Sequence, residues 1–279
     1  MALGRRDEYE ANHAGFLELG ESKGNLFIVA QAHVGDALLA LLDGRFEDVM
    51  TAAARVLEAA PDDENFRLTY FGHVGRVGLE QDRAGEMLPV LDAARAITPD
   101  VPFMHATSAR FRAASGDLVG AVELLDLFMG GFSRWGRDWL WPFAITEAAE
   151  ATVAVRSTRH AEVLIEELDR YPGLMVLVGA AVMCFGSFDR YRGMLLSVLG
   201  RHDEAVAALE AARLSEVALR SPVFSSRTSY WLASALAQRG GPGDRDQAAA
   251  ELASVIAIAD RVGLVEIARL SRERAAELS

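Results

Sequence analysis

Residues 191–205 read YRGMLLSVLGRHDEA, and this stretch decides the fold. Its first half is a short apolar helix pattern with a small residue, Gly193, near its start. Gly200 then supplies the left-handed backbone that ends a helix, and a second helical pattern begins directly after it. Two helices joined by so short a turn must approach closely, and a side chain larger than alanine at the crossing would hold them apart. The stretch therefore predicts a helical hairpin with Gly193 at the crossing.

The same pattern recurs along the chain. A small residue occupies one equivalent position at intervals of 34 to 44 residues, at Ala37, Gly75, Ala109, Ala149, Gly193 and Ala233. A glycine followed five residues later by valine or alanine recurs at 44–49, 116–121, 200–205 and 243–248. Periods in this range are typical of stacked helix-turn-helix units. We predict an all-α fold, a right-handed α-α superhelix of about six degenerate helix-turn-helix units.

We expect the 279 residues to form a single helical-repeat domain. A leading helix falls within 1–23, near 7–20, the repeats span 24–262, and a closing helix falls within 263–279. The long interval between Ala149 and Gly193 places an apolar insertion near 172–186, which should fold under a neighbouring repeat. Asp117 and Asp244 stand where a side-chain oxygen can cap the next helix. The expected helix pairs are 26–43 with 46–59, 64–81 with 83–97, 102–115 with 118–129, 139–156 with 158–170, 187–199 with 202–219, and 223–239 with 245–262.

Composition and charge argue against several classes of function. The formal net charge is −12, with 40 acidic and 28 basic residues, which disfavours contact with a phosphate backbone, so no direct nucleic-acid binding is expected. Cys184 is the only cysteine, so no intrachain disulfide can form and a reducing compartment fits. Residues 1–13 hold no apolar segment typical of a signal peptide, and the apolar run 174–188 is too short to span a membrane. We expect a cytoplasmic protein that does not bind a membrane.

The turns resemble those of tetratricopeptide repeats. Gly44-Arg45-Phe46 and the run 200–205 match the family's glycine-containing turn most closely, although its usual tryptophan near the start of the first helix is absent. The segments 191–201, 230–233 and 243–248 are similar to the C-terminal helical region of large bacterial signalling ATPases, including LuxR-type and maltose-activator-like regulators, and of multidomain nucleotide cyclases. This resemblance covers about residues 24–278 and implies a tetratricopeptide-like solenoid. The sequence lacks the ATPase, cyclase and DNA-binding modules of those proteins, so none of their activities is implied.

No residue pattern indicates a catalytic residue, a cofactor or a metal. The segment 20–24, GESKG, lacks the glycine spacing of a phosphate-binding loop. No two of the six histidines lie three to five residues apart, as a shared transition metal would favour. Cys184 lies in the apolar insertion, where a buried, inert thiol is expected. The acidic clusters 62–64 and 166–167 are expected to be solvated helix ends and faces.

Four charged residues are candidates for a binding groove. In tetratricopeptide proteins the inner face of the first helix of each unit lines a concave groove, and that face holds Arg76 and Arg110 at equivalent positions. Glu150 and Arg190 lie on later helices of the same kind. Stacked arginines could hold a carboxylate by charge-assisted, bidentate hydrogen bonds. The alternative is that they are ordinary surface arginines.

The densest aromatic cluster holds Trp135, Trp139 and Trp141, with Phe132 and Phe143 beside them. As a functional feature, the three tryptophans would anchor a peptide or ligand. The alternative is a wide hydrophobic joint between two repeat units.

These observations favour a non-catalytic scaffold for protein interaction or effector sensing in a bacterial signalling or transcriptional regulatory system. Its partner would be a protein or peptide, with a small-molecule effector as a further ligand, and self-association into a homo-oligomer stays open. One alternative is a free-standing adaptor whose groove binds an extended peptide. An enzyme built on a helical array is a further alternative, which no residue selects.

Overall fold

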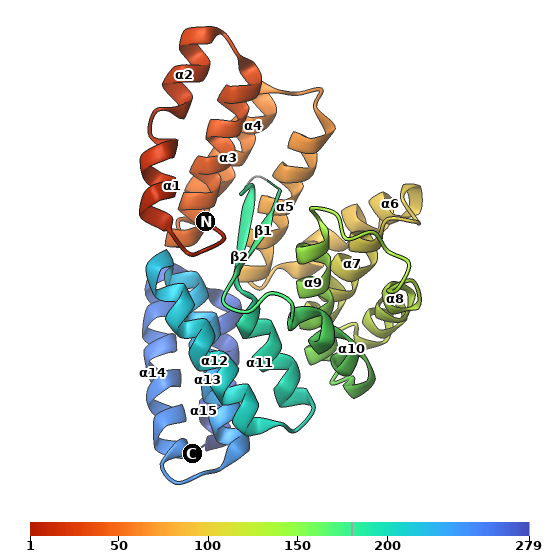
Figure 1. The fold of residues 1–279 in the computed structure, drawn as a ribbon, viewed down its shortest axis with the longest axis vertical. Coiled ribbons are helices and arrows are strands. Elements are labelled where there is room, and N and C mark those ends of the chain that lie inside the picture. The colour runs from red at the N-terminus through yellow and green to blue at the C-terminus, as the bar shows by residue number, and fades with distance from the viewer. Residues whose placement is uncertain (180, 279) are drawn as a thin grey trace.

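The structure, a computed structural model, describes residues 1–179 and 181–278, so Ala180, in the predicted insertion, and Ser279, at the end of the predicted closing helix, lie outside the described residues. Helices follow one another in pairs, and each pair packs against the next in chain order (Figure 1). The prediction of an all-α array of stacked helix-turn-helix units is confirmed. The helices of the first half are α1 (Arg6–His13), α2 (Phe16–Lys23), α3 (Leu26–Asp43), α4 (Phe46–Ala59), α5 (Glu64–Glu80), α6 (Leu88–Ile97), α7 (Pro102–Ala114) and α8 (Leu118–Gly130).

The second half continues the pattern after a loop. Two short 3₁₀ turns, η1 (Ala84–Met87) and η2 (Val217–Leu219), extend the start of α6 and the end of α12. With these turns included, the repeat helices end within three residues of the predicted ranges. The leading helix is an exception, because it breaks near Gly15 into α1 and α2. The helices of the second half are α9 (Trp141–Ala154), α10 (Thr158–Leu168), α11 (Phe188–Val198), α12 (His202–Glu216), α13 (Pro222–Arg239), α14 (Asp244–Val262) and α15 (Val265–Leu278).

Glycines and short polar side chains set the helix ends. Gly44 ends α3 with a φ of 72°, a left-handed backbone that favours glycine. Asp117 caps α8 as predicted, because its Oδ1 accepts a hydrogen bond of 2.9 Å from a backbone amide in the first turn. Asp244 does not cap α14, which corrects the prediction. Gly243 takes the capping position with a φ of 82°, and Asp244 accepts a hydrogen bond of 2.8 Å from the amide of Gly241 instead.

The six repeated small residues are all buried. A Cβ placed on Gly193 of α11 would lie 2.5 Å from Leu209 Cγ of α12. A Cβ on Gly75 of α5 would lie 3.1 Å from the ring of Phe111 in α7. Both positions are sites of close approach, where larger side chains would push neighbouring helices apart.

The apolar insertion is buried and forms a β-hairpin, which the sequence did not predict. β1 (Met175–Val178) pairs antiparallel with β2 (Met183–Ser187), and Leu177 stands opposite Cys184. The runs are four and five residues long, Gly173 and Gly179 stand on either side of the first, and short apolar runs of this kind suit buried strands better than helices. In Figure 1 the hairpin lies beside α5, between α3 and α9, and β1 contacts α9.

The helix array closes on itself. α13 packs against α3, and α15 packs against α5, so the last units contact the first. Ser221 Oγ donates a hydrogen bond to the Leu42 carbonyl at 2.6 Å, and Arg6 Nη1 donates one to the Leu219 carbonyl at 3.1 Å. The open concave face expected of a solenoid is therefore replaced by an enclosed interior.

One continuous hydrophobic cluster runs through the array from α3 to α15. Among the described residues, α3 is the helix that is long and apolar enough, by length and composition alone, to cross a membrane. Nine of its residues are buried in this structure, including Leu38, Leu41 and Leu42. A core position of this kind accounts for a helix that is apolar on most sides.

Candidate functional site

Charged side chains converge on the enclosed interior from helices far apart in the sequence. The side chains are at most 9% exposed, and burial of so much charge is tolerated only when opposite charges pair. We call this set the inner charge network; it consists of Arg76, Arg110, Arg190 and Arg227 with Glu80, Glu150, Glu216 and Glu266.

Arg227 of α13 joins the two ends of the array. Its Nε and Nη2 donate hydrogen bonds to the two carboxylate oxygens of Glu80 of α5, both at 2.9 Å, and Nη2 also reaches Glu266 of α15 at 2.7 Å. Glu80 pairs with Arg76 as well. Burial acts to raise the pKa of Glu80, but the charges of Arg227 and Arg76 outweigh it, so the pKa is lowered. Glu80 is therefore ionised in the interior.

Arg110 of α7 extends the network to α9. It pairs with Glu150, and its Nη2 lies 3.3 Å from Glu266. Burial acts to raise the pKa of Glu150, but Arg110 and Arg227 more than offset this effect and lower the pKa to about 2. The negative charge of Glu150 is thus held in place by the arginines around it.

Arg190 and Glu216 fasten the β-hairpin to this interior. Arg190 Nη1 donates a hydrogen bond to Glu216 at 2.7 Å, and its Nη2 donates to the carbonyl of Phe185 in β2. Glu216 also accepts hydrogen bonds from the Ser187 amide and the Thr228 hydroxyl, both at 2.7 Å. One carboxylate therefore connects α11, α13 and the end of β2.

Two of the four predicted groove residues do not face an open groove. Arg76 and Arg190 are 3% and 1% exposed, and the Phe185 ring lies 5.6 Å from the Arg76 guanidinium. The hairpin and the closure of the array cover them, which corrects the expected setting. Arg110 and Glu150 do line a pocket. Their partners in this structure are glutamates and arginines of the same chain, and ligand binding by either residue stays a prediction.

Glu147 of α9 is a further buried carboxylate beside the network. It is 4% exposed and forms no hydrogen bond or ion pair with the described residues. Burial raises its pKa, and the negative charge of Glu150 raises it further, to about 8. Glu147 is therefore mostly protonated at neutral pH and adds little negative charge beside the network.

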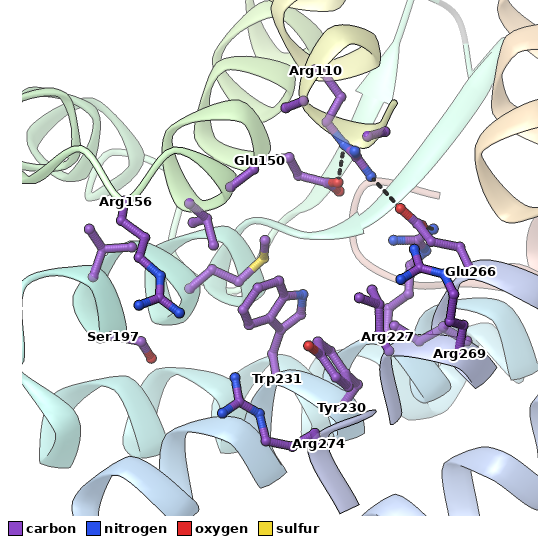
Figure 2. Close-up of a pocket in the computed structure, with 18 of the residues that line it drawn as sticks. Arg110, Glu150, Arg156, Ser197, Arg227, Tyr230, Trp231, Glu266, Arg269 and Arg274 are labelled. Atoms are coloured by element: carbon purple, nitrogen blue, oxygen red, sulfur yellow. Dashed lines mark hydrogen bonds and ion pairs between the residues drawn. The ribbon is translucent and has the colours of Figure 1, made fainter. Parts of the chain in front are cut away.

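A pocket of about 480 Å³ lies beside the network (Figure 2), a size that suits a small organic ligand. α13 contributes two aromatic rings to its wall, Tyr230 and Trp231, which meet edge to face with their centroids 5.1 Å apart. Apolar side chains from four helices complete the wall, among them Val153, Met194, Val198, Ile267 and Leu270. The charged side chains of the wall are Arg110, Glu150, Arg156, Arg227, Glu266, Arg269 and Arg274.

Arg156 has an unusual backbone. In all six units, the residue seven positions after the repeated small residue has a positive φ. Glycine holds this position in four units, whereas Asp82 and Arg156 hold it in the other two with φ of 58° and 52°. A left-handed backbone costs a residue with a side chain about 1–2 kcal/mol. Sequence reasoning missed Arg156, although an arginine where four other units carry glycine was visible in the repeat alignment.

The three tryptophans of the predicted aromatic anchor differ in exposure. Trp141 is 2% exposed, stacks on Phe128 with ring centroids 5.9 Å apart, and donates its indole N–H to Glu167 at 2.9 Å. Trp135 is half-buried and donates to the Phe128 carbonyl at 2.8 Å, so both rings pack in a joint between α8 and α9. Trp139 is 53% exposed. Glu167 is buried as an acceptor in this joint, which corrects its expected place on a solvated face.

Two further titratable groups of the described interior, His73 and Cys184, have shifted pKa values. Burial lowers the pKa of His73 to about 4, so this histidine is neutral at physiological pH. Burial raises the pKa of Cys184 to about 11, which disfavours its thiolate. No group of three or more His, Cys, Asp or Glu residues that could hold a metal ion occurs within 1–179 and 181–278. The arrangement can bind charge and enclose a ligand.

Comparisons with known proteins give a likeness in fold. A solved tetratricopeptide repeat protein from Parabacteroides merdae ATCC 43184 is similar over 95% of this chain and 98% of that chain, with 12% sequence identity and a TM-score of 0.47. No family model matches the sequence. No curated protein matches it either. The description of this chain as a helical-repeat protein rests on its own helix pairs.

Proposed function

We propose that this chain is a non-catalytic, effector-sensing scaffold of a bacterial signalling or transcriptional regulatory system in the cytoplasm. The stacked helix pairs form the scaffold, and the pocket beside the inner charge network takes the effector. The outer helices hold a protein partner; α8 exposes apolar side chains there, such as Val119 at 74% and Leu127 at 55%. The regulatory setting is supported by the resemblance of segments 191–201, 230–233 and 243–248 to helical regions of signalling ATPases.

The observation that supports an effector is that the interior of the array is filled, whereas a pocket beside it is accessible. An extended peptide would need an open concave face, but the β-hairpin and the α3–α13 contact occupy that face. The buried arginines already pair with glutamates of the chain, so they offer a peptide no free donors along the interior. A pocket of about 480 Å³ fits a compact ligand better than a long segment. An effector is therefore favoured over the peptide adaptor.

The pocket also supports binding in preference to turnover. Its carboxylates, Glu150 and Glu266, each pair with an arginine. The pKa of Glu150 is about 2, far below the range in which a general base works near neutral pH.

Native mass spectrometry of the protein purified from a bacterial lysate tests this function. We expect a bound small molecule that the pocket-filling variant Ala154→Trp loses. Ala54→Trp, which adds the same ring at an exposed site on α4, should retain it. A protein that carries no small molecule and binds an extended peptide would favour the adaptor. A protein that chemically converts the molecule it carries would show an enzyme instead.

A further inference from the structure

The arginines of the pocket wall differ in whether the protein neutralises them. Arg156 forms no hydrogen bond or ion pair from its guanidinium to any residue within 1–179 and 181–278, and its side chain is exposed. The pocket therefore carries one uncompensated positive charge in a protein whose net charge is −12. The other four arginines of the wall pair with carboxylates; they are Arg110, Arg227, Arg269 and Arg274.

The backbone of Arg156 is a second, independent observation. Asp82 has the same left-handed conformation in another unit, and an internal contact accounts for it, because its carboxylate accepts hydrogen bonds of 2.9 and 3.2 Å from Arg269 across the closed array. Arg156 forms no such contact within the described chain. Strained residues of this kind concentrate at ligand sites, where the side chain is needed for binding.

The surroundings of Arg156 define two halves of a binding site. Figure 2 shows its guanidinium reaching into the pocket toward Ser197 and the ring of Trp231. A planar guanidinium matches a carboxylate with two parallel hydrogen bonds. Trp231 is half-buried and presents a flat apolar surface, and Val153 and Val198 add aliphatic surface.

We infer that the pocket binds a small organic carboxylate, whose carboxylate group pairs with Arg156 and whose flat apolar body packs against Trp231. A single free guanidinium balances a single negative charge, which favours a monoanion over a phosphate dianion. The apolar part of the wall favours a ligand with an apolar body over a small inorganic anion. Because this inference names the chemistry of the effector, it rests on the proposed function.

Isothermal titration calorimetry with three probes tests the inference: 2-naphthoate, its uncharged analogue 2-naphthamide, and acetate. We expect the intact chain to bind 2-naphthoate at least about tenfold more tightly than the amide, because hydrogen bonds to a charged group contribute on this scale. Acetate lacks the apolar body and should bind more weakly than 2-naphthoate by a similar factor.

Arg156→Gly separates binding from folding. Glycine relieves the left-handed strain, so we expect an unchanged or higher melting temperature together with loss of the preference for 2-naphthoate over the amide. Arg220→Gly is the matched control: Arg220 is an exposed arginine with a φ of 47° outside the pocket, and its removal changes the net charge equally. Its binding should equal that of the intact chain. If Arg156→Gly does not fold, Arg156→Asn provides the test, because asparagine tolerates a positive φ.

Three results would overturn the inference. Equal affinities for 2-naphthoate and 2-naphthamide would show that the pocket does not select for a carboxylate. Unchanged 2-naphthoate binding by folded Arg156→Gly would remove the role of Arg156. No binding of either naphthalene probe by the intact chain would reject this ligand class, whereas the proposed function would still be judged by the small molecule that the purified protein retains.

Discussion

Arg227 and Glu80 lie 147 residues apart in the sequence and form a bidentate pair with two hydrogen bonds of 2.9 Å, in an interior where the Glu80 side chain is fully buried. The pair joins α13 to α5, so it is a contact between repeat units that are far apart in the sequence. Desolvation offsets much of the attraction within a buried charge pair, and in some proteins such pairs fix the specificity of an arrangement. We therefore expect this pair to fix which units meet when the array closes.

Replacing Arg227 by methionine should destabilise the fold strongly. Arg227→Met leaves the fully buried Glu80 carboxylate with Arg76 as its remaining partner, so we expect a loss of about 3–5 kcal/mol in the free energy of unfolding, measured by urea denaturation. Adding Glu80→Gln should not recover that loss, because buried Arg76 would then lose its carboxylate partner. Arg201→Met, which breaks the exposed Arg201–Glu204 pair, is the control and should change the free energy of unfolding far less. Equal losses for the two arginine variants would contradict the role given to the buried pair.

Enlarging a crossing residue should also destabilise the array. Gly193→Leu and Ala149→Leu place extra carbon atoms at buried positions, and the Cβ at 193 would already lie 2.5 Å from Leu209 Cγ. We expect each variant to lose ~1–3 kcal/mol in the free energy of unfolding, measured by urea or thermal denaturation. Gly136→Leu is the control, because a Cβ at Gly136 meets no atom within 4 Å. Melting temperatures unchanged from that of the intact chain would argue against the assigned crossings.

The helix pairs could be predicted because their determinants act within a few residues. Gly44 ends α3 by its own backbone conformation, and Asp117 caps α8 through an amide in the next turn. The small residues recur at the repeat period, so their burial follows from the sequence. The same reasoning brought Arg110 and Glu150 to one face, and in the structure they form an ion pair.

Closure and the hairpin could not be predicted because they depend on contacts between distant units. Nothing in the repeat period indicates that Ser221 will bond the Leu42 carbonyl, or that Glu266 will pair with Arg110. The burial of Arg190 depends on where the hairpin packs, and that follows from closure. The repeat pattern therefore placed the four predicted groove residues on the inner side of the array, but it did not predict that Arg76 and Arg190 would be buried there.

Cys184 should resist thiol reagents in the folded protein. It is fully buried in β2, so a reagent cannot reach it, and burial raises its pKa to about 11, so little thiolate is present near neutral pH. We expect negligible reaction with a chromogenic disulfide reagent at pH 7.5 and one thiol per chain after unfolding in guanidinium. Ser22→Cys combined with Cys184→Ala provides an exposed thiol as a control for reagent activity. Rapid stoichiometric labelling of the native chain would mean that the hairpin opens readily.

Glu147 should make the free energy of unfolding fall as the pH rises above 4.5, the ordinary pKa of a glutamate. Its pKa is about 8 in the folded chain against the ordinary 4.5, so the folded state binds this proton more tightly than the unfolded chain does. The resulting stabilisation is complete below pH 4.5 and is lost as the pH rises through about 8. At ~1.36 kcal/mol per pKa unit, the loss across this window is on the order of a few kcal/mol.

Urea unfolding at several pH values between 5 and 9 measures this effect. Glu147→Gln carries no titrating proton, so its stability should decline less than that of the intact chain and should exceed it at pH 9. Glu166→Gln, at an exposed position on α10, should follow the intact chain. The pKa of Glu150 is about 2, so its own contribution changes below pH 4.5, outside this window. The shifted pKa values of His73 and Glu216 also affect stability at these pH values, and the comparison of Glu147→Gln with the intact chain cancels their contributions. Parallel profiles for Glu147→Gln and the intact chain would show that Glu147 is ionised in the fold and places a negative charge beside the inner charge network.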